Sequence, residues 1–522
     1  MSPSDQLQPR LLATLCRTSR LRLVALILPV ALFILFLAAN AGFAQTAPAP
    51  ATATAVATAA ATSAPSTAPA PSPVSSANTN DKADTGDSAW MLTSSALVML
   101  MVPGLALFYA GMVRRKNVLG TMMHSMAALG IIGVEWVVIG YAMAFGATNH
   151  GIVGWDSQLL FLRGITPDMI HKGTHTPELV FVMFQGMFAI ITPALITGAF
   201  AERVKFSAFA IFTLLWGLLI YNPLAHWVWA PGGWLGNQGG IGAIDFAGGT
   251  VVHISAGASA LVSVLIIGKR IGYPKSVLQP NSLTLTLLGA GLLWFGWFGF
   301  NGGSAVGSNG SAALAFTNTQ IAAAAGGLAW LLVEWTWHGR PTSVGFASGL
   351  VAGLVAITPA SGFVPPYAAI IIGIVAGLVC FGSVMAKSKL GYDDSLDAFG
   401  VHGVGGFLGA ILTGVFAVAV FGGTKGLVDG APRQVWIQLV AAASAAAFAG
   451  IGTFILVTVI DKVIGFRITR TEEIEGMDVS VHGEQGWMLE QMPAPAVELP
   501  GSIPASPERM PTRERPKTSS TH

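Results

Sequence analysis

The chain has 522 residues, of which 53% are hydrophobic and only 10% are charged, and its formal net charge is +2. Because an ordinary soluble domain contains about 25% charged residues, this composition excludes a soluble globular protein, and the small net charge gives no sign of a nucleic-acid partner. The two cysteines, Cys16 and Cys380, lie in very different segments, so we expect no disulfide framework.

Residues 1–44 have the pattern of a secretory signal peptide. Four arginines precede the apolar run LVALILPVALFILFLAA, and the triplet Gly-Phe-Ala that follows offers a cleavage site after Ala44. The run is long for a signal peptide, so an uncleaved membrane anchor is the alternative. Residues 45–86 are mostly Ala, Thr, Pro and Ser, and residues 491–522 are rich in Pro and charge. Neither segment can bury a core, and we predict a disordered periplasmic linker and a disordered tail.

Apolar runs of about 18 or more residues recur between Asp87 and Asp461, each long enough to cross a hydrocarbon layer of ~30 Å. We therefore predict an all-α polytopic membrane domain over residues 87–465. Its eleven transmembrane helices are expected near residues 88–113, 117–146, 178–200, 206–224, 247–268, 283–301, 311–336, 342–358, 366–386, 398–421 and 435–460.

Positive charge in the connecting loops predicts the orientation of these helices. One set of alternate loops carries most of the lysines and arginines, including Arg114, Arg203 and Lys269. Because cytoplasmic loops are enriched in Lys and Arg, this set is expected to face the cytoplasm. The N-terminus is then outside and the C-terminus inside.

Two histidines occupy matching places in the two halves of the predicted domain. Five helices are an odd number, so helices one to five and six to ten would form inverted repeats. His253 lies in the fifth span, eight residues after Asp245, and His402 lies in the tenth, five residues after Asp397. A histidine in a membrane helix is costly and usually faces a bundle interior or cavity.

The pair of histidines allows several interpretations. Two imidazoles could relay protons or line a path for a small hydrogen-bonding solute. They could also hold a metal or a haem, although two ligands alone make a poor metal site. A structural hydrogen-bonding role for each ring is the remaining alternative.

Aromatic residues gather where the outer ends of several predicted helices meet. The third span contains FQGMF (184–188), the sixth contains WFGWFGFNGGS (294–304), and Trp229 lies just outside the fourth. Each alone is typical of an interfacial belt or of core packing. Together they could hold a cation against their ring faces, with Ser304 accepting a hydrogen bond from it.

These motifs resemble the ammonium transporter family (Amt/MEP/Rh), over about Asp81 to Trp487. The segments that carry the resemblance are GLALFYAGMVRRKNVL, FQGMFA, GAFAERVKFSA, NPLAHWVWAPGG, DFAGGTVVHISAG, GWFGFNGGSA, GLVAGLVAITPASG and FGVHGVGG, in the family's order. The bacterial Amt branch fits best. The resemblance implies two inverted five-helix repeats plus a final helix, and a homotrimer in the bacterial inner membrane with one pore in each subunit.

The resemblance also implies roles for individual residues. The implied outer site for ammonium consists of Phe188, Trp229, Phe300 and Ser304. Phe188 and Phe300 would form a stacked gate, His253 and His402 would line the pore, and Asp245 would shape the outer site from behind. Ammonium would be deprotonated and pass as ammonia, with its proton relayed separately, and neither enzymatic activity nor a metal or cofactor is expected.

Two other functions remain open on the same fold. One is an electroneutral gas channel of the Rh kind, for ammonia or carbon dioxide, against which the outer residues Trp229 and Ser304 argue. The other is an ammonium sensor. Such proteins usually append a signalling domain, and residues 488–522 are too short and polar to form one.

The segment TEEIEGMDVSVHGEQGW, residues 471–487, resembles the family's cytoplasmic C-terminal motif, which couples subunits and meets a PII signalling protein. Its implied regulatory residues are Glu472, Glu473, Gly476, Asp478, His482 and Gly483, within a regulatory segment at 466–490. We expect its acidic stretch to dock on a basic loop of a neighbouring subunit, such as the loop with Lys269 and Arg270.

Glu135 departs from the family's pattern. It lies within the second predicted span, in GIIGVEWVVIGYAM, where much of the family carries an apolar residue. The sequence predicts that Glu135 is either protonated or paired with a neighbour that the sequence does not identify.

Overall fold

The computed structural model describes residues 82–276 and 278–487, and those up to Gly486 belong to one unit. The predicted signal peptide, the linker up to residue 81 and the tail from residue 488 lie outside the described residues. The secondary structure within them is helical, apart from one hairpin of β1 (Ala147–Asn149) and β2 (Val153–Trp155). The hairpin is antiparallel, with Thr148 opposite Gly154.

Ten helical segments in the described part are long and apolar enough to cross a membrane. They are Thr85–Met112, Arg115–Phe145, Glu178–Phe200, Phe206–Trp229, Gly249–Ile267, Leu283–Gly303, Gly310–His338, Pro366–Leu390, Phe399–Phe416 and Arg433–Ile464. A shorter apolar helix, Ser343–Ile357, lies where the eighth span is predicted. The chain is thus a helical polytopic membrane protein, and the predicted ends of these segments differ from the observed ends by at most five residues.

The segments are built from the following α-helices. They are α2 (Thr85–Met112), α3 (Val118–Glu135), α4 (Tyr141–Phe145), α5 (Glu178–Phe200), α6 (Phe206–Trp216), α7 (Asn222–Trp229), α8 (Ser255–Ile267), α9 (Leu283–Gly303), α10 (Gly310–His338), α11 (Ser343–Ile357), α12 (Pro366–Leu390), α13 (Val404–Phe416), α14 (Ala419–Gly422), α15 (Arg433–Ile464), α16 (Arg470–Glu475) and α17 (Met477–His482). Short 3₁₀ turns form η1 (Arg115–Asn117), η3 (Ser157–Leu162) and η7 (Leu427–Asp429).

Four π-helical turns interrupt the spans of the described part. They are η2 (Trp136–Gly140), η4 (Gly217–Tyr221), η5 (Gly249–Ile254) and η6 (Phe399–Gly403). Such turns insert an extra residue into a helix and are frequent at functional sites. Here each contains or adjoins a buried polar side chain: Glu135 precedes η2, Asn222 follows η4, and the two histidines lie in η5 and η6.

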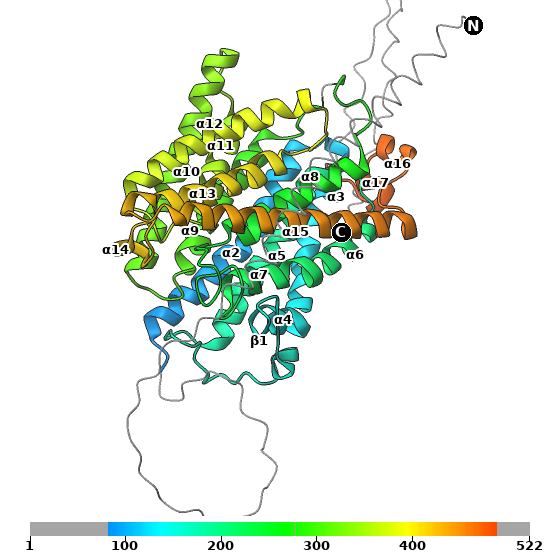
Figure 1. Ribbon diagram of the computed structural model, residues 1–522. Coiled ribbons are helices and arrows are strands. Elements are labelled where there is room, and N and C mark those ends of the chain that lie inside the picture. Colours follow the sequence, from blue (N-terminus) through cyan, green and yellow to red (C-terminus); the bar gives the residue numbers. More distant parts are fainter. Residues whose placement is uncertain (1–81, 277, 488–522) are drawn as a thin grey trace, which may run out of the picture. The chain divides into compact units, whose positions relative to one another are not determined.

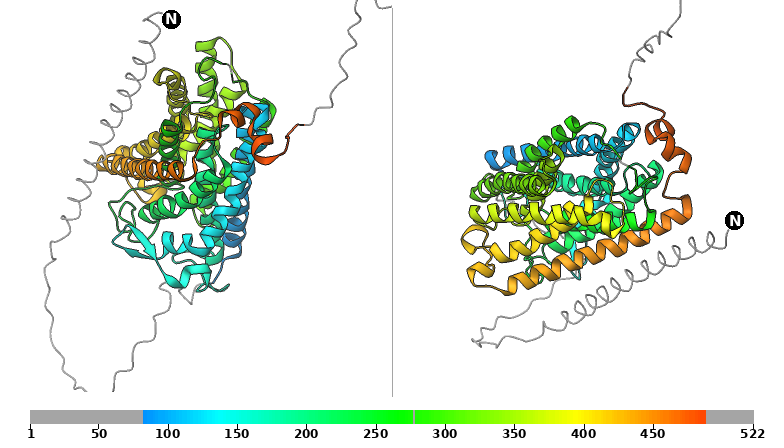
Figure 2. Two further views of the ribbon diagram at one scale, coloured as in Figure 1. Left: turned by 90° about the vertical axis from the view of Figure 1, so that its right-hand side faces the viewer. Right: turned by 90° about the horizontal axis from the view of Figure 1, so that it is seen from above.

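Helix α15 runs the length of the unit, from the end where α14 lies to the end where α16 and α17 lie (Figures 1 and 2). Its 32 residues correspond to about 48 Å at 1.5 Å per residue. Helix α2 packs along α9, α10 packs against α11 and α12, and α8 packs against α15. The two ends of α15 therefore mark the two ends of the bundle.

The helices that follow η5 and η6 cross in direct backbone contact. A Cβ atom on Gly257 of α8 would lie only 2.2 Å from Cα of Gly403 at the end of η6. Small residues allow membrane helices to approach this closely. The close crossing brings the two histidine-bearing turns together.

Candidate functional site

His253 and His402, from the two halves of the chain, lie side by side in the bundle interior. Their rings are almost parallel, with centroids 5.3 Å apart and an interplanar angle of 18°. The exposed fractions are 1% for His253 and 4% for His402. Both ring nitrogens of His253 and Nδ1 of His402 are buried without a hydrogen-bond partner among the described residues. Because an unpaired buried polar group is costly, these nitrogens would gain from a hydrogen bond with any molecule that reaches them.

The histidines line a small enclosed cavity with an otherwise hydrophobic wall. Its lining residues are Met101, Leu105, Phe108, Ile191, Leu195, Val252, His253, Leu293, Trp297, Phe300, Val351 and His402. The cavity has room for little more than one water-sized molecule. Within the described residues, no group of three His, Cys, Asp or Glu side chains is arranged to hold a metal ion.

An aromatic stack adjoins this cavity through Phe300, which is one of the lining residues. The rings of Phe188 and Phe300 are stacked with centroids 4.2 Å apart, and Trp229 meets Phe188 edge-on at 5.9 Å. Phe300 also lies 6.1 Å from the His253 ring. Ser304 ends α9 and donates its hydroxyl proton to the Phe300 carbonyl at 2.9 Å. Four of the residues expected at the outer site therefore come together.

Asp245 contacts both Trp229 of the aromatic stack and the start of the helix that carries His253. Its buried carboxylate accepts backbone N–H bonds from Gly248, Gly249, Thr250 and Val251 at 2.7–3.1 Å, so it caps the helix that begins with η5. A negative charge at a helix N-terminus is favourable. Burial raises the pKa of Asp245, and the four N–H groups oppose that rise. Its backbone carbonyl accepts the indole N–H of Trp229 at 2.9 Å, so Asp245 lies at the edge of the Trp229 ring.

Asp394, and not Asp397, is the counterpart of Asp245 in the second half. It lies eight residues before His402, the same spacing as Asp245 to His253. Its carboxylate accepts the N–H groups of Ala398 and Phe399 at the start of η6. Asp397 instead forms an ion pair with Lys387. The pairing of Asp397 with His402 that we drew from the sequence was therefore wrong.

Backbone conformation explains that error. Asp397 has a φ of +61° and takes the place of Gly248, whose φ is +108°. The stretches DFAGGTVVH and DSLDAFGVH thus align without a gap. Asp397 occupies a left-handed position that is usually a glycine, and the residue that caps the helix is Asp394, three positions earlier. The internal symmetry is consequently closer than the sequence indicated.

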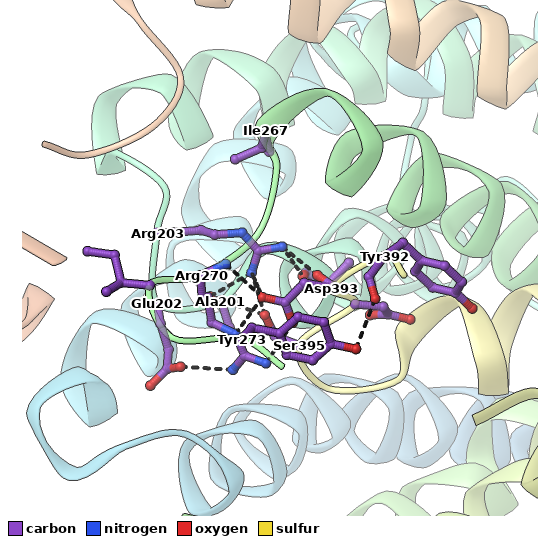
Figure 3. A network of polar contacts seen from close by, with 12 residues as sticks. Ala201, Glu202, Arg203, Ile267, Arg270, Tyr273, Tyr392, Asp393 and Ser395 are labelled. Atoms are coloured by element: carbon purple, nitrogen blue, oxygen red, sulfur yellow. Dashed lines mark hydrogen bonds and ion pairs between the residues drawn. The ribbon is translucent and has the colours of Figure 1, made fainter. Parts of the chain in front are cut away.

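A cluster of buried charges, which we call the arginine–carboxylate cluster, joins the loops after α5 and α8 to the loop before η6 (Figure 3). It lies at the end of the bundle that carries α16, because Glu473 of α16 accepts the backbone N–H of Ile271, next to Arg270. Its members are Arg114, Glu202, Arg203, Arg270 and Asp393. Arg270 binds Asp393 through two nitrogens, at 2.8 and 3.0 Å, and Glu202 through a third at 2.9 Å. Arg114 binds the other oxygen of Glu202 at 2.9 Å, and Arg203 donates to the Asp393 carbonyl at 2.6 Å.

The arginines keep both carboxylates of this cluster ionised. Burial alone would raise the pKa of Glu202, but Arg270 and Arg114 hold it below its ordinary value. Burial likewise opposes ionisation of Asp393, and Arg270 and Arg203 hold its pKa down. We did not predict this cluster from the sequence, although Arg203 is fully buried. The one signal was a charged pair, Glu202 and Arg203, directly after an apolar span.

The C-terminal segment folds onto the same end of its own chain. Glu473 accepts the backbone N–H of Ile271 and an N–H of Arg467, both at 2.6 Å. Asn117 accepts the N–H of Met477, and Asp478 accepts the N–H of Gly120, both at 2.8 Å. We expected a contact with Lys269 and Arg270 of a neighbouring subunit. Within the chain the segment contacts its own residues Ile271 and Arg467, and the Arg270 guanidinium is bound to Glu202 and Asp393. Docking on a neighbouring subunit stays a prediction.

The other predicted regulatory residues shape the ends of α16 and α17. Glu472 forms a reciprocal capping box with Thr469. Gly476 and Gly483 have φ values of +109° and +68° and end the two short helices. His482 packs edge-on against Phe206, with centroids 5.4 Å apart. The segment therefore has a defined fold against the membrane unit.

Comparison with known proteins identifies the family. The model of the Ammonium Transporter Family matches residues 89–487. An ammonium transporter of Aquifex aeolicus is 48% identical over 410 residues, which cover 78% of this chain and 95% of that protein. An ammonium transporter of Bacillus subtilis is 48% identical over 407 residues, with 77% and 98% covered.

Solved structures agree with this fold. Mep2 of Saccharomyces cerevisiae, 35% identical, gives a TM-score of 0.69 and covers 76% of this chain and 90% of its own. A protein described as a sensor Amt protein, 30% identical, gives a TM-score of 0.70, with 76% and 97% covered. By its sequence and its fold, the chain belongs to the ammonium transporter family.

Proposed function

We propose that this protein transports ammonium by binding the ion at the aromatic stack, deprotonating it and conducting ammonia along the cavity of the two histidines. The observation that carries the proposal is a route with two kinds of surface. Ring faces suited to a cation lie at Phe188, Phe300 and Trp229, and beyond them lies an apolar cavity whose polar atoms are unpaired imidazole nitrogens. The names of the relatives support the same substrate.

The outer site would bind ammonium by its charge and its N–H groups. A cation over an aromatic face gains about 0.5–1 kcal/mol when exposed and about 2 when desolvated. The hydroxyl proton of Ser304 is already donated to the Phe300 carbonyl, so its oxygen is left to accept an N–H from the ion. Asp245 would favour the arriving cation from behind Trp229.

The cavity would select by requiring the loss of charge. Moving an ion into an apolar, water-poor space is costly, and a metal cation has no means of becoming neutral there. Ammonium can release a proton and continue as ammonia, which needs only hydrogen bonds. An unpaired ring nitrogen of the histidine pair can accept that proton and relay it separately. Phe188 and Phe300 would act as the gate between the two stages.

We also propose a topology and an assembly for this protein. We infer eleven spans in two inverted five-helix repeats plus a final helix, with α11 as the short eighth span, the N-terminus outside and the C-terminus inside. Residues 1–44 would be a signal peptide for the bacterial inner membrane, and residues 45–86 a periplasmic linker. We further propose that the protein is a homotrimer and that residues 466–490 bind a cytoplasmic PII-type partner.

Current through proteoliposomes under an ammonium gradient tests the mechanism. The proposal predicts an ammonium-driven current that potassium does not support. Ammonia flux without current would favour the Rh-like gas channel. A similar fold in a sensor Amt protein makes signalling the second candidate, and saturable ammonium binding with neither flux nor current would favour it.

A further inference from the structure

Glu135 is a buried carboxyl group with a single hydrogen-bond partner. It ends α3 at the start of the π-helical turn η2 and is 5% exposed. Asn222, the first residue of α7, donates from Nδ2 to Glu135 Oε1 at 2.7 Å. None of the ion pairs between described residues includes Glu135. The neighbour that the sequence could not identify is thus an uncharged amide.

One oxygen of Glu135 and one oxygen of Asn222 have no hydrogen-bond partner, and a proton on the carboxyl group would let them bind each other. Oε2 of Glu135 and Oδ1 of Asn222 are both buried and both without a hydrogen bond. If Glu135 were ionised, both atoms would be acceptors only, and a full charge would lie in an apolar span beside one neutral donor. A carboxylic acid has one O–H donor. With a proton on Oε2, the O–H of Glu135 could donate a hydrogen bond to Oδ1 of Asn222, and both oxygens would then have a partner.

The surrounding backbone leaves room for an acid in this place. A Cβ atom on Gly140, the last residue of η2, would lie 2.9 Å from Oε2, and one on Gly217, the first residue of η4, would lie 3.8 Å away. The carboxyl group therefore fits between the two π-helical turns. A larger residue at position 140 would displace it.

The pair connects two of the three helices that carry the outer aromatic residues, α5 and α7. Trp136, which follows Glu135, donates from Nε1 to the Val182 carbonyl of α5 at 2.9 Å, and α5 carries Phe188. Asn222 begins α7, and Trp229 ends it. The segment of Glu135 and Trp136 thus holds both α5 and α7.

We propose that Glu135 is a protonated carboxylic acid in the folded protein and a positioning residue, whose two hydrogen bonds with Asn222 hold α7 and Trp229 against Phe188. The first part concerns only the state of the acid. The second part rests on the proposed function, because it assumes that Phe188 and Trp229 bind ammonium.

Infrared spectroscopy of the purified protein tests the protonation state without any transport measurement. At neutral pH, the difference spectrum between wild type and Glu135→Gln should contain the C=O stretch of a protonated carboxylic acid, shifted by exchange into D₂O. Glu334→Gln is the matched control, because Glu334 also lies in an apolar span but accepts the N–H and hydroxyl of Thr342, donors that suit a carboxylate. Loss of carboxylate bands in place of the acid band on Glu135→Gln would overturn the first part.

Transport kinetics test the positioning role. Glutamine can make both hydrogen bonds to Asn222, so Glu135→Gln should keep the wild-type KM for ammonium. Glu135→Leu removes both and should raise KM roughly two- to tenfold, with maximal flux less affected, as expected for lost hydrogen bonds. If Glu135→Leu does not fold, Asn222→Leu carries the same expectation. An unchanged KM in the leucine variant would overturn the second part, whereas a wild type without ammonium transport would overturn the proposed function and leave the infrared result standing.

Discussion

The cavity of the two histidines and the carboxylates of the arginine–carboxylate cluster differ in how their buried polar atoms are paired. In the cavity, both nitrogens of His253 and one of His402 have no partner. In the cluster, all four carboxylate oxygens of Glu202 and Asp393 accept at least one hydrogen bond. Both regions are buried, and both join segments that are distant in the sequence.

This difference separates polar groups that hold the fold from those available to a solute. Carboxylates that are paired with arginines gain their stability from the partners already present, and removing such a partner leaves a buried charge uncompensated. An unpaired nitrogen in an apolar wall lowers stability until something binds it. We therefore expect substitutions in the cavity to impair transport with little loss of stability, and substitutions in the cluster to do the reverse.

The largest expected effect is on transport through the cavity. His253→Ala and His402→Ala should each abolish selective ammonium transport, because alanine removes the proton-accepting path without burying a charge. The thermal unfolding midpoint should remain near that of wild type, since neither ring makes a side-chain hydrogen bond in the described structure. Ammonium-driven current and melting curves of the purified variants provide the comparison.

A smaller side effect helps to interpret this test. Removing a ring widens the cavity, so we expect either alanine variant to leak other ions. Full ammonium current with wild-type selectivity over potassium in both variants would contradict the relay. A large drop in melting temperature would show instead that the rings are structural.

The second largest effect should be on stability. Arg270→Ala leaves Asp393 and one oxygen of Glu202 without their strongest partner, and breaking a buried pair costs about 3–5 kcal/mol. The unfolding midpoint should fall strongly, as measured by thermal melting in detergent. Arg340→Ala is the control, since Arg340 is exposed. Equal stability of the two variants would remove the distinction between cluster and surface charge.

The sequence predicts the spans and the two histidines, but it does not predict which buried polar groups are paired. The spans could be predicted to within a few residues because membrane helices are continuous apolar runs, and the two histidines stood out because such residues are rare there. The fourth span is an instructive exception. Its predicted end at residue 224 fell near Pro223, yet the helix continues because the proline lies at the start of α7, after a π-helical turn, where its missing N–H does little harm.

The paired networks depend on tertiary contacts that no local pattern encodes. Arg270 meets Asp393 across 123 residues, and Asn222 meets Glu135 across 87. Asp394 could have been found from the repeated eight-residue spacing to histidine. We chose Asp397 instead, because it lies nearer to His402 in the sequence.

Acid should weaken the cluster. The pKa values of Glu202 and Asp393 are held below their ordinary values, so the folded protein binds fewer protons than the unfolded chain at low pH. Their contribution is complete above the ordinary carboxyl pKa values, about 4, and is lost as the pH falls through the lower folded values. The melting temperature should therefore drop increasingly below about pH 4.5. A profile that stays flat to pH 3 would contradict this reading of the cluster.

The smallest expected effect lies at the outer aromatic site, where the contrast between the two regions is least sharp. Trp229 donates a hydrogen bond to Asp245, so it is both paired and available to a cation. Trp229→Leu removes one ring face and should weaken apparent ammonium affinity roughly two- to thirtyfold, from a cation–π contribution of about 0.5–2 kcal/mol. Ser304→Ala should act in the same direction, because it removes an oxygen that would accept an N–H from the charged ion. Maximal flux should change less than affinity in both, since the cavity is untouched. Concentration curves that overlay the wild type would show that these residues only pack the outer end of the bundle, whereas a loss of flux at unchanged affinity would place them in the gate and not in the binding site.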